Sequence, residues 1–218
     1  MNKHQFSLGF AALLLGSSIL ACNFSTATRG EIDPPSTTLS PPPTAEFQLE
    51  APFGESPYFL EEFSSSLPES WSASPGWNIG AGSLSPNSAG AILEIPGEWQ
   101  EMRVILNLRV RSGAGSLDFN VSPSGAYRLT FAVDEISLDW MPAEGDPEQL
   151  TSAPAELGVG WHVLVLDQDQ GVIQVELDGE TLLSGLRPDY SPSGSLRLGN
   201  SGNGLLEIDR LVVAPPGE

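Results

Sequence analysis

The stretch MRVILNLRVR, Met102–Arg111, decides the fold of this chain. The side chains at positions 104, 106, 108 and 110 are all apolar, and those between them are polar except for Ile105. Successive side chains of a β-strand point to opposite faces, so this pattern predicts a strand with one packed face and one largely wet face. Antiparallel sheets with one solvated face show this alternation.

Similar short alternating runs recur from about Pro57 onward, separated by Gly, Pro, Ser, Asn and Asp. No stretch shows a sustained helical period. The spacing predicts an all-β fold, a sandwich of two antiparallel sheets. The expected strands are Tyr58–Phe63, Ala91–Ile95, Met102–Arg111, Ser116–Val121, Tyr127–Val133, Ile136–Trp140, Trp161–Asp167, Val172–Leu177, Thr181–Leu183, Ser195–Leu198 and Leu205–Val213.

The beginning of the chain has the pattern of an export signal. Lys3 and His4 precede an apolar run over 6–20, which is shorter than the roughly 20 residues that span a bilayer. The run ends in Ile-Leu-Ala-Cys at Cys22, which resembles the bacterial lipobox. That resemblance implies cleavage before Cys22 and lipid on its thiol, and hence a membrane-anchored protein of the cell envelope that faces outside the cytoplasm. The alternatives are an ordinary secretory signal or a true membrane helix.

The expected organisation has three parts: a signal peptide over 1–22, a linker over 23–56 and a β-sandwich domain over 57–214. The linker is rich in Pro, Ser and Thr, and runs such as Ser-Pro-Pro-Pro-Thr at 40–44 favour extended polyproline II segments. We expect it to hold the domain away from the lipid surface.

Composition excludes several function classes. The formal net charge is −19, so nucleic acid is an unfavourable partner. Cys22 is the only cysteine. If it carries lipid, the mature chain has no disulfide, no cysteine-ligated zinc and no cysteine nucleophile. The acidity favours either simple solubility or the binding of Ca²⁺ or another cation by carboxylates.

A family resemblance appears at Gly160-Trp161-His162, the strand after it, and the Val172–Leu177 strand with its Asp178-Gly179 turn. Together with Phe59–Ser64 and the closing 206–213 run, this unit resembles the laminin-G and concanavalin A-like lectin/glucanase superfamily. The resemblance implies a jelly-roll whose concave face or rim loops bind glycans or proteins. It also implies core positions for Trp71 and Trp161 and a strand-packing role for His162.

The case for an enzyme is weak in the sequence. Glu176-Leu-Asp-Gly-Glu180 imitates the Glu-x-Asp-x-(x)-Glu strand of related glycosidases, whose retaining members need two carboxyls about 5–5.5 Å apart. However, Asp178-Gly179 is typical of a two-residue hairpin turn. Glu176 and Glu180 would then face each other across a hairpin rim, and we expect no catalytic residues.

Candidate binding residues are aromatic side chains next to turn residues, since such rings can stack on sugars. These are Trp77, Trp99, Trp140 and Tyr190, with Asp139 beside Trp140 as an acceptor for sugar hydroxyls. Such rings are more often a core edge or a lid, and that is the alternative for each. Candidate Ca²⁺ ligands are Asp134, Glu135, Asp167 and Asp169, against the alternative of solvated turns.

The sequence therefore predicts a lipid-anchored β-sandwich that binds a glycan or a surface protein without catalysis. Two alternatives stay open. One is a divergent glycoside hydrolase acting on a β-glucan, and the other is a structural or assembly lipoprotein without a small ligand.

Overall fold

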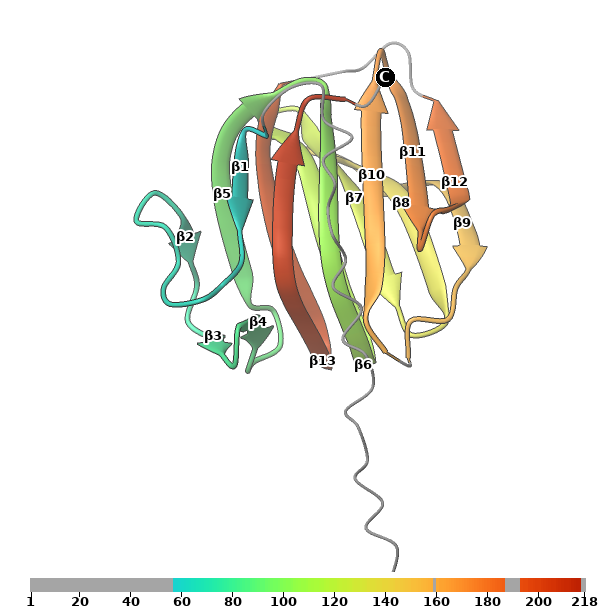
Figure 1. The fold of residues 1–218 in the computed structure, drawn as a ribbon. Helices are drawn as coiled ribbons and strands as arrows, with labels where there is room; N and C mark the ends of the chain where they lie inside the picture. The colour runs from blue at the N-terminus through green and yellow to red at the C-terminus, as the bar shows by residue number, and fades with distance from the viewer. Residues whose placement is uncertain (1–56, 159, 187–192, 217–218) are drawn as a thin grey trace, which may run out of the picture. The chain divides into compact units, whose positions relative to one another are not determined.

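The computed structural model describes residues 57–158, 160–186 and 193–216. All of them belong to the second of two compact units, residues 48–218. Their regular structure is β throughout (Figure 1). The strands are β1 Phe59–Glu61, β2 Ser72–Ala73, β3 Trp77–Gly80, β4 Ser83–Pro86, β5 Ile92–Trp99, β6 Met102–Ser122, β7 Gly125–Ala132, β8 Glu135–Pro142, β9 Glu148–Pro154, β10 His162–Asp169, β11 Val172–Leu177, β12 Glu180–Leu186 and β13 Gly194–Ala214.

The strands form two layers, and every pairing is antiparallel. Sheet I contains β1, the second half of β13, the first half of β6, and then β10, β11 and β12. Sheet II contains β2, β5, the first half of β13, the second half of β6, and then β7, β8 and β9. The predicted all-β sandwich of two antiparallel sheets is confirmed.

Two long strands, β6 and β13, belong to both layers. Their register runs from Ala214 opposite Arg103 to Ser195 opposite Val121, with an irregularity between Ser201 and Leu205. The sequence pattern predicts two separate strands in place of each of them. Glycine near the midpoint of each long strand lets the pair pass from one sheet into the other, so the backbone hydrogen bonding stays continuous.

The core lies between the two sheets and follows the predicted alternation. Val104, Leu106, Leu108 and Val110 are fully buried, and they pack with Leu, Ile, Val and Phe side chains from both layers. Ile105 points to the opposite face yet is only 8 % exposed. Trp71 packs against the core, with its ring 5.5 Å from that of Phe59, as the resemblance implied.

Four strands were missed. β2, β3 and β4 have at most four residues each, too few for an alternating run to stand out. β9 has no buried residue in its seven positions, so it lacks the apolar half of the pattern. The predicted turn is confirmed, since Asp178 and Gly179 have φ values of 52° and 85°.

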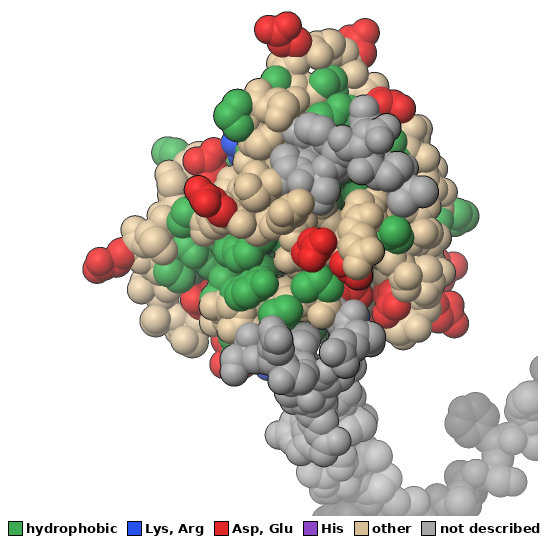
Figure 2. Space-filling model, turned by 90° about the horizontal axis from the view of Figure 1, so that it is seen from above, with side chains coloured by type: hydrophobic (Ala, Val, Ile, Leu, Met, Phe, Trp, Pro, Cys, Tyr) green, Lys and Arg blue, Asp and Glu red, His purple; other side chains and the backbone are tan. Residues whose placement is uncertain are grey.

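The surface of the sandwich reflects the acidic composition. Seen from above, Asp and Glu side chains stand around its margin and few basic atoms are visible (Figure 2). Within the described residues, no helix is long and apolar enough to cross a membrane. Cys22, the 1–22 and 23–56 segments and Tyr190 lie outside the described residues.

Candidate functional site

The outer face of sheet II carries a line of side chains with alternating charge, one from each of five adjacent strands. Cross-strand partners run Glu94–Arg197–Asp118–Arg128–Asp139, from β5 to β8. We call these five residues the charged row. Neighbouring strands lie about 4.8 Å apart, so each charge is one strand spacing from a group of opposite sign.

Asp118 is the centre of the charged row and is only 3 % exposed. Arg128 donates from Nε and Nη2 to its two carboxylate oxygens, at 2.7 and 2.9 Å. The hydrogen bond to Asp118 raises the pKa of Arg128, although burial opposes this. From the other side, Nη1 of Arg197 lies 3.9 Å from Asp118, while its Nη2 donates to Glu94 at 3.0 Å. The row is therefore a connected network around a buried carboxylate.

A second row, of hydroxyl groups, runs beside the charged row. Ser116, Thr130, Ser137 and Ser152 are cross-strand partners on β6, β7, β8 and β9. Each of the first three is two residues from a member of the charged row, so it shares the same face. Ser137 donates to Asp139 at 3.1 Å. An open depression of about 400 Å³, lined partly by Glu94 and Glu98, adjoins the row at β5.

The structure places the side chains of Asp139 and Trp140 on opposite faces of sheet II. Asp139 lies on the outer face, in the charged row, whereas Trp140 is 6 % exposed and packs edge-on against Tyr127 with the ring centroids 5.1 Å apart. Consecutive strand residues point to opposite faces, so the two side chains cannot share a ligand on one side. Trp140 alternates in register with the buried Ile136 and Leu138, and this alternation in the sequence could have predicted its burial.

Two other candidate rings, Trp77 and Trp99, also contact the core. Trp77 and Trp99 are partly buried and pack against it. The Trp99 ring lies 5.9 Å from that of Phe59 and close over Gly97, where a Cβ would come within 2.3 Å of it. Their use as sugar-stacking platforms therefore has no support in their packing.

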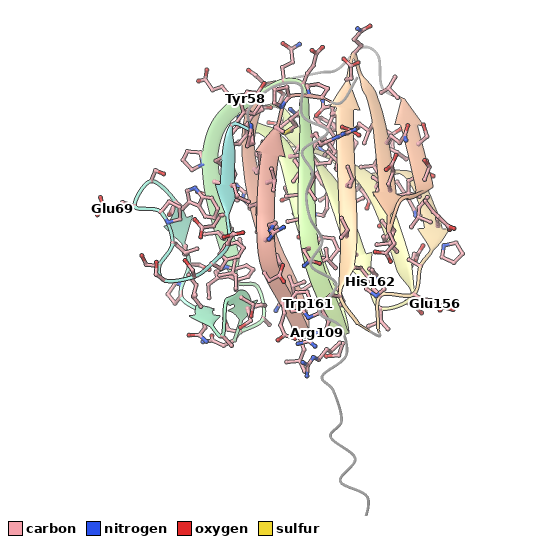
Figure 3. The ribbon with its side chains drawn as sticks, in the orientation of Figure 1. Tyr58, Glu69, Arg109, Glu156, Trp161 and His162 are labelled. Carbon is pink, nitrogen blue, oxygen red and sulfur yellow. The ribbon has the colours of Figure 1, made fainter. Side chains whose placement is uncertain are left out.

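Trp161 differs from its expected position in the opposite way, since it is exposed instead of buried. The resemblance implied a core position, but the residue is 39 % exposed, and the guanidinium of Arg109 lies 4.8 Å from its ring centroid. Figure 3 shows both side chains at one end of the sandwich, where β6 and β10 meet. Trp161 has the parity of Val163 and Val165 rather than of the buried Leu164, and this parity could have predicted its outward direction.

His162 points to the other side of β10. Its Nδ1 lies 2.8 Å from an oxygen of Asp178, whose second oxygen accepts the backbone N–H of Val163 at 2.9 Å. Both side chains line an open depression of about 720 Å³, together with Glu156 and Glu180. His162 thus ties the start of β10 to the β11–β12 turn, consistent with a role in strand packing.

The candidate Ca²⁺ ligands lie in two separate groups, Asp134 with Glu135 and Asp167 with Asp169. Both oxygens of Asp167 accept hydrogen bonds from Arg103, at 2.7 and 2.6 Å, so its charge is already paired. Asp134 lines the depression beside His162, and His162 is five strand positions, about 17 Å, from Asp167 along β10. Glu135 and Asp169 are exposed. Among the described residues, no group of three His, Cys, Asp or Glu side chains could hold a metal ion.

The two glutamates of the glycosidase-like motif do not form a pair. Glu176 is opposite Thr181, and Glu180 is opposite Leu177. Cross-strand partners share a face and neighbours alternate, so Glu176 and Glu180 point to opposite sides of the sheet. The expectation that they face each other across the hairpin rim was wrong, and the pair is even less suited to catalysis than the sequence suggested.

Comparison with solved structures identifies the fold. A lichenase from a mouse hindgut metagenome has a TM-score of 0.59 at 11 % identity, over 72 % of this chain and 98 % of its own. The carbohydrate-binding module CBM66 from Bacillus subtilis has a TM-score of 0.54 at 13 % identity, over 66 % and 94 %. A Bacillus subtilis protein of unknown function with a galectin-like fold has a TM-score of 0.59 at 12 % identity, over 75 % and 98 %.

The chain therefore has the concanavalin A-like lectin/glucanase fold, as predicted. No family model and no curated protein matches it. The fold is shared by a carbohydrate-binding module and by glucanases, so the fold alone does not decide the function.

Proposed function

We propose that the sandwich binds a glycan without catalysis, through the outer face of sheet II. The observation that carries the proposal is the charged row with its parallel row of hydroxyls. Sugar hydroxyls both donate and accept hydrogen bonds, and the row offers guanidinium donors and carboxylate acceptors in alternation. The ion pairs hold these groups in position before the ligand arrives, which lowers the entropic cost of binding.

The arrangement of the carboxylates in the charged row supports a non-catalytic role. A retaining enzyme needs two carboxyls about 5–5.5 Å apart, and an inverting enzyme needs room for a water between them. In the charged row, Glu94, Asp118 and Asp139 belong to strands that are two spacings apart, about 9.6 Å, and an arginine lies on the strand between each two of them. We expect no reducing sugar from any β-glucan. Release that disappears in Asp118→Asn would overturn the non-catalytic part of the proposal.

Glycan binding is tested with the full-length chain in detergent micelles, on an array of wall and storage polysaccharides. Arg128→Ala should weaken binding to the best ligand about tenfold, since it removes a charged hydrogen-bonding group. Arg103→Ala is the matched control, because Arg103 makes the same bidentate pair, with Asp167, on the outer face of sheet I. No binding to any glycan, or equal losses in the two variants, would contradict the proposal.

We also propose that lipid on Cys22 anchors the protein in the cell envelope, with residues 23–56 as the tether. The support is the lipobox-like Ile-Leu-Ala-Cys sequence after the apolar run. Several acyl chains would make the anchor long-lived, since one chain alone binds membranes only marginally. Metabolic labelling with palmitate should mark the native protein but not Cys22→Ala, and the variant should leave the membrane fraction. An unlabelled native protein would disprove the anchor.

A further inference from the structure

Four residues at one end of sheet I form a group that the proposed glycan-binding face does not use. Arg109 and Arg111 lie on the outer face of β6, Glu207 is the β13 partner of Arg109, and Trp161 precedes β10. We call these four residues the Trp161 corner. Arg109 and Trp161 lie together at the end of the sandwich opposite Tyr58 (Figure 3). The charged row belongs to the other sheet.

The two arginines share one carboxylate. Arg109 contacts Oε2 of Glu207 through Nε at 2.8 Å and Nη2 at 2.6 Å. Arg111 contacts the same oxygen through Nε at 3.1 Å, and its side chain is 50 % exposed. In the described part of the chain, the two Nη groups of Arg111 donate no hydrogen bond to another residue. These groups are therefore available to a ligand.

The charge of the corner is opposite to that of the whole chain. Two guanidinium groups and one carboxylate leave one positive charge in excess, in a chain whose formal net charge is −19. One excess positive charge suits a monoanion. The planar fork of an arginine matches a carboxylate, which accepts two parallel N–H bonds.

The exposed ring supplies a second recognition element. Arg109 lies over the Trp161 ring, and 39 % of the residue remains open to solvent. The apolar face of a sugar ring can pack on such an aromatic surface. His162 and the carboxylates of its depression lie on the other side of β10, so they do not oppose an anion at the outer face.

We propose that the Trp161 corner is a second binding site, for a uronic acid residue of an acidic polysaccharide. The sugar ring packs on Trp161, and its carboxylate accepts hydrogen bonds from the Nη groups of Arg111. Arg109 and Glu207 orient these two side chains. The site is independent of the outer face of sheet II.

The test is calorimetric titration of the full-length chain, in detergent micelles, with an oligogalacturonate and with its methyl ester. The ester keeps the sugar ring but removes the charge. The titration uses about 0.15 M salt, where the Debye length is about 8 Å and the charges of the corner outweigh distant ones. We expect the acid to bind at least tenfold more tightly than the ester.

Variants of single residues locate the bound acid on the surface. Arg111→Ala and Trp161→Ala should each weaken binding of the acid about tenfold. Arg210→Ala should change it less than twofold; Arg210 is the matched control, an arginine on the outer face of the same sheet with a single pair, to Glu62 at 3.1 Å. Arg128→Ala, on sheet II, should also leave it unchanged, so this site and the proposed glycan-binding face can fail separately.

Glu207→Gln should change the affinity for the acid in the opposite direction from the alanine variants. Removing the competing carboxylate should tighten binding of the acid severalfold, whereas a merely structural role for Glu207 would lead to a loss. The proposal is overturned if the acid does not bind, if the ester binds equally well, or if Arg111→Ala behaves like Arg210→Ala.

Discussion

Among single residues, Asp209 is notable because its carboxyl is partly buried. It lies at the irregularity in β13 between Ile208 and Arg210, and its Oδ1 is buried without a hydrogen-bond partner among the described residues. Burial raises the pKa of the Asp209 carboxyl, while a hydrogen bond from Asn107 and the charge of Arg210 partly oppose this. The ionised form is therefore disfavoured in the folded state.

The raised pKa makes a prediction about pH. The folded state holds a proton at Asp209 at pH values where the unfolded chain has lost it, so stability falls as pH rises through this window, which begins at the ordinary pKa of 3.8. Asp209→Asn should therefore raise the free energy of unfolding at pH 7, and this gain should shrink as pH falls toward 3.8. Urea unfolding of both proteins over this range measures the difference. A gain that is constant with pH would show that the Asp209 proton is not its cause.

Among the strands, β6 and β13 connect the two sheets, because they remain paired as they pass from one sheet into the other. Gly113 of β6 has φ of 70°, and a Cβ there would lie 2.5 Å from the Cα of Gly204 in β13. Left-handed backbone costs an ordinary residue roughly 1–2 kcal/mol, and contact with backbone atoms adds to it. This crossing point requires glycine for both reasons.

Substitution at the crossing point should therefore destabilise the sandwich strongly. We expect Gly113→Ala to cost clearly more than about 2 kcal/mol in the free energy of unfolding, measured by chemical denaturation. Gly82→Ala is the matched control. Gly82 has a similar φ of 76° but nothing within 4 Å of the added Cβ, so it should lose only about 1–2 kcal/mol. Equal losses would mean that the close approach of β6 and β13 does not matter.

For the molecule as a whole, the dominant feature is excess negative charge. Every arginine within the described residues is paired with a carboxylate. With a formal net charge of −19, most carboxylates of the chain have no cation to balance them. Exposed ion pairs contribute at most about 1 kcal/mol each to stability. Screening by salt weakens these pairs, but it also weakens the repulsion among the remaining carboxylates, which should be the larger effect.

Salt should therefore stabilise this protein. Raising the ionic strength from about 0.01 to 0.15 M shortens the Debye length from about 30 to about 8 Å and screens the repulsion. We expect the midpoint of thermal unfolding to rise by a few degrees, since about 1 kcal/mol corresponds to about 2–4 °C in a chain of this size. Circular dichroism follows the transition. A midpoint that falls with salt would show that the ion pairs dominate.

The sequence by itself determined the β-sandwich, the buried face of Met102–Arg111 and the Asp178-Gly179 turn. Each of these follows from side-chain alternation or from φ preferences, which are properties of a few neighbouring residues. Parity along a strand also separates Asp139 from Trp140, and Trp161 from His162. The strands without a buried face, such as β9, gave no such signal.

Only the tertiary structure decided which side chains lie next to one another on each face of the two sheets. The charged row joins residues from positions 94 to 197, and the Trp161 corner joins residues from 109 to 207. No local pattern contains these neighbours, because they depend on strand order and register across the sheets. The same register pairs Asp167 with Arg103 and leaves the side chain of Trp161 exposed.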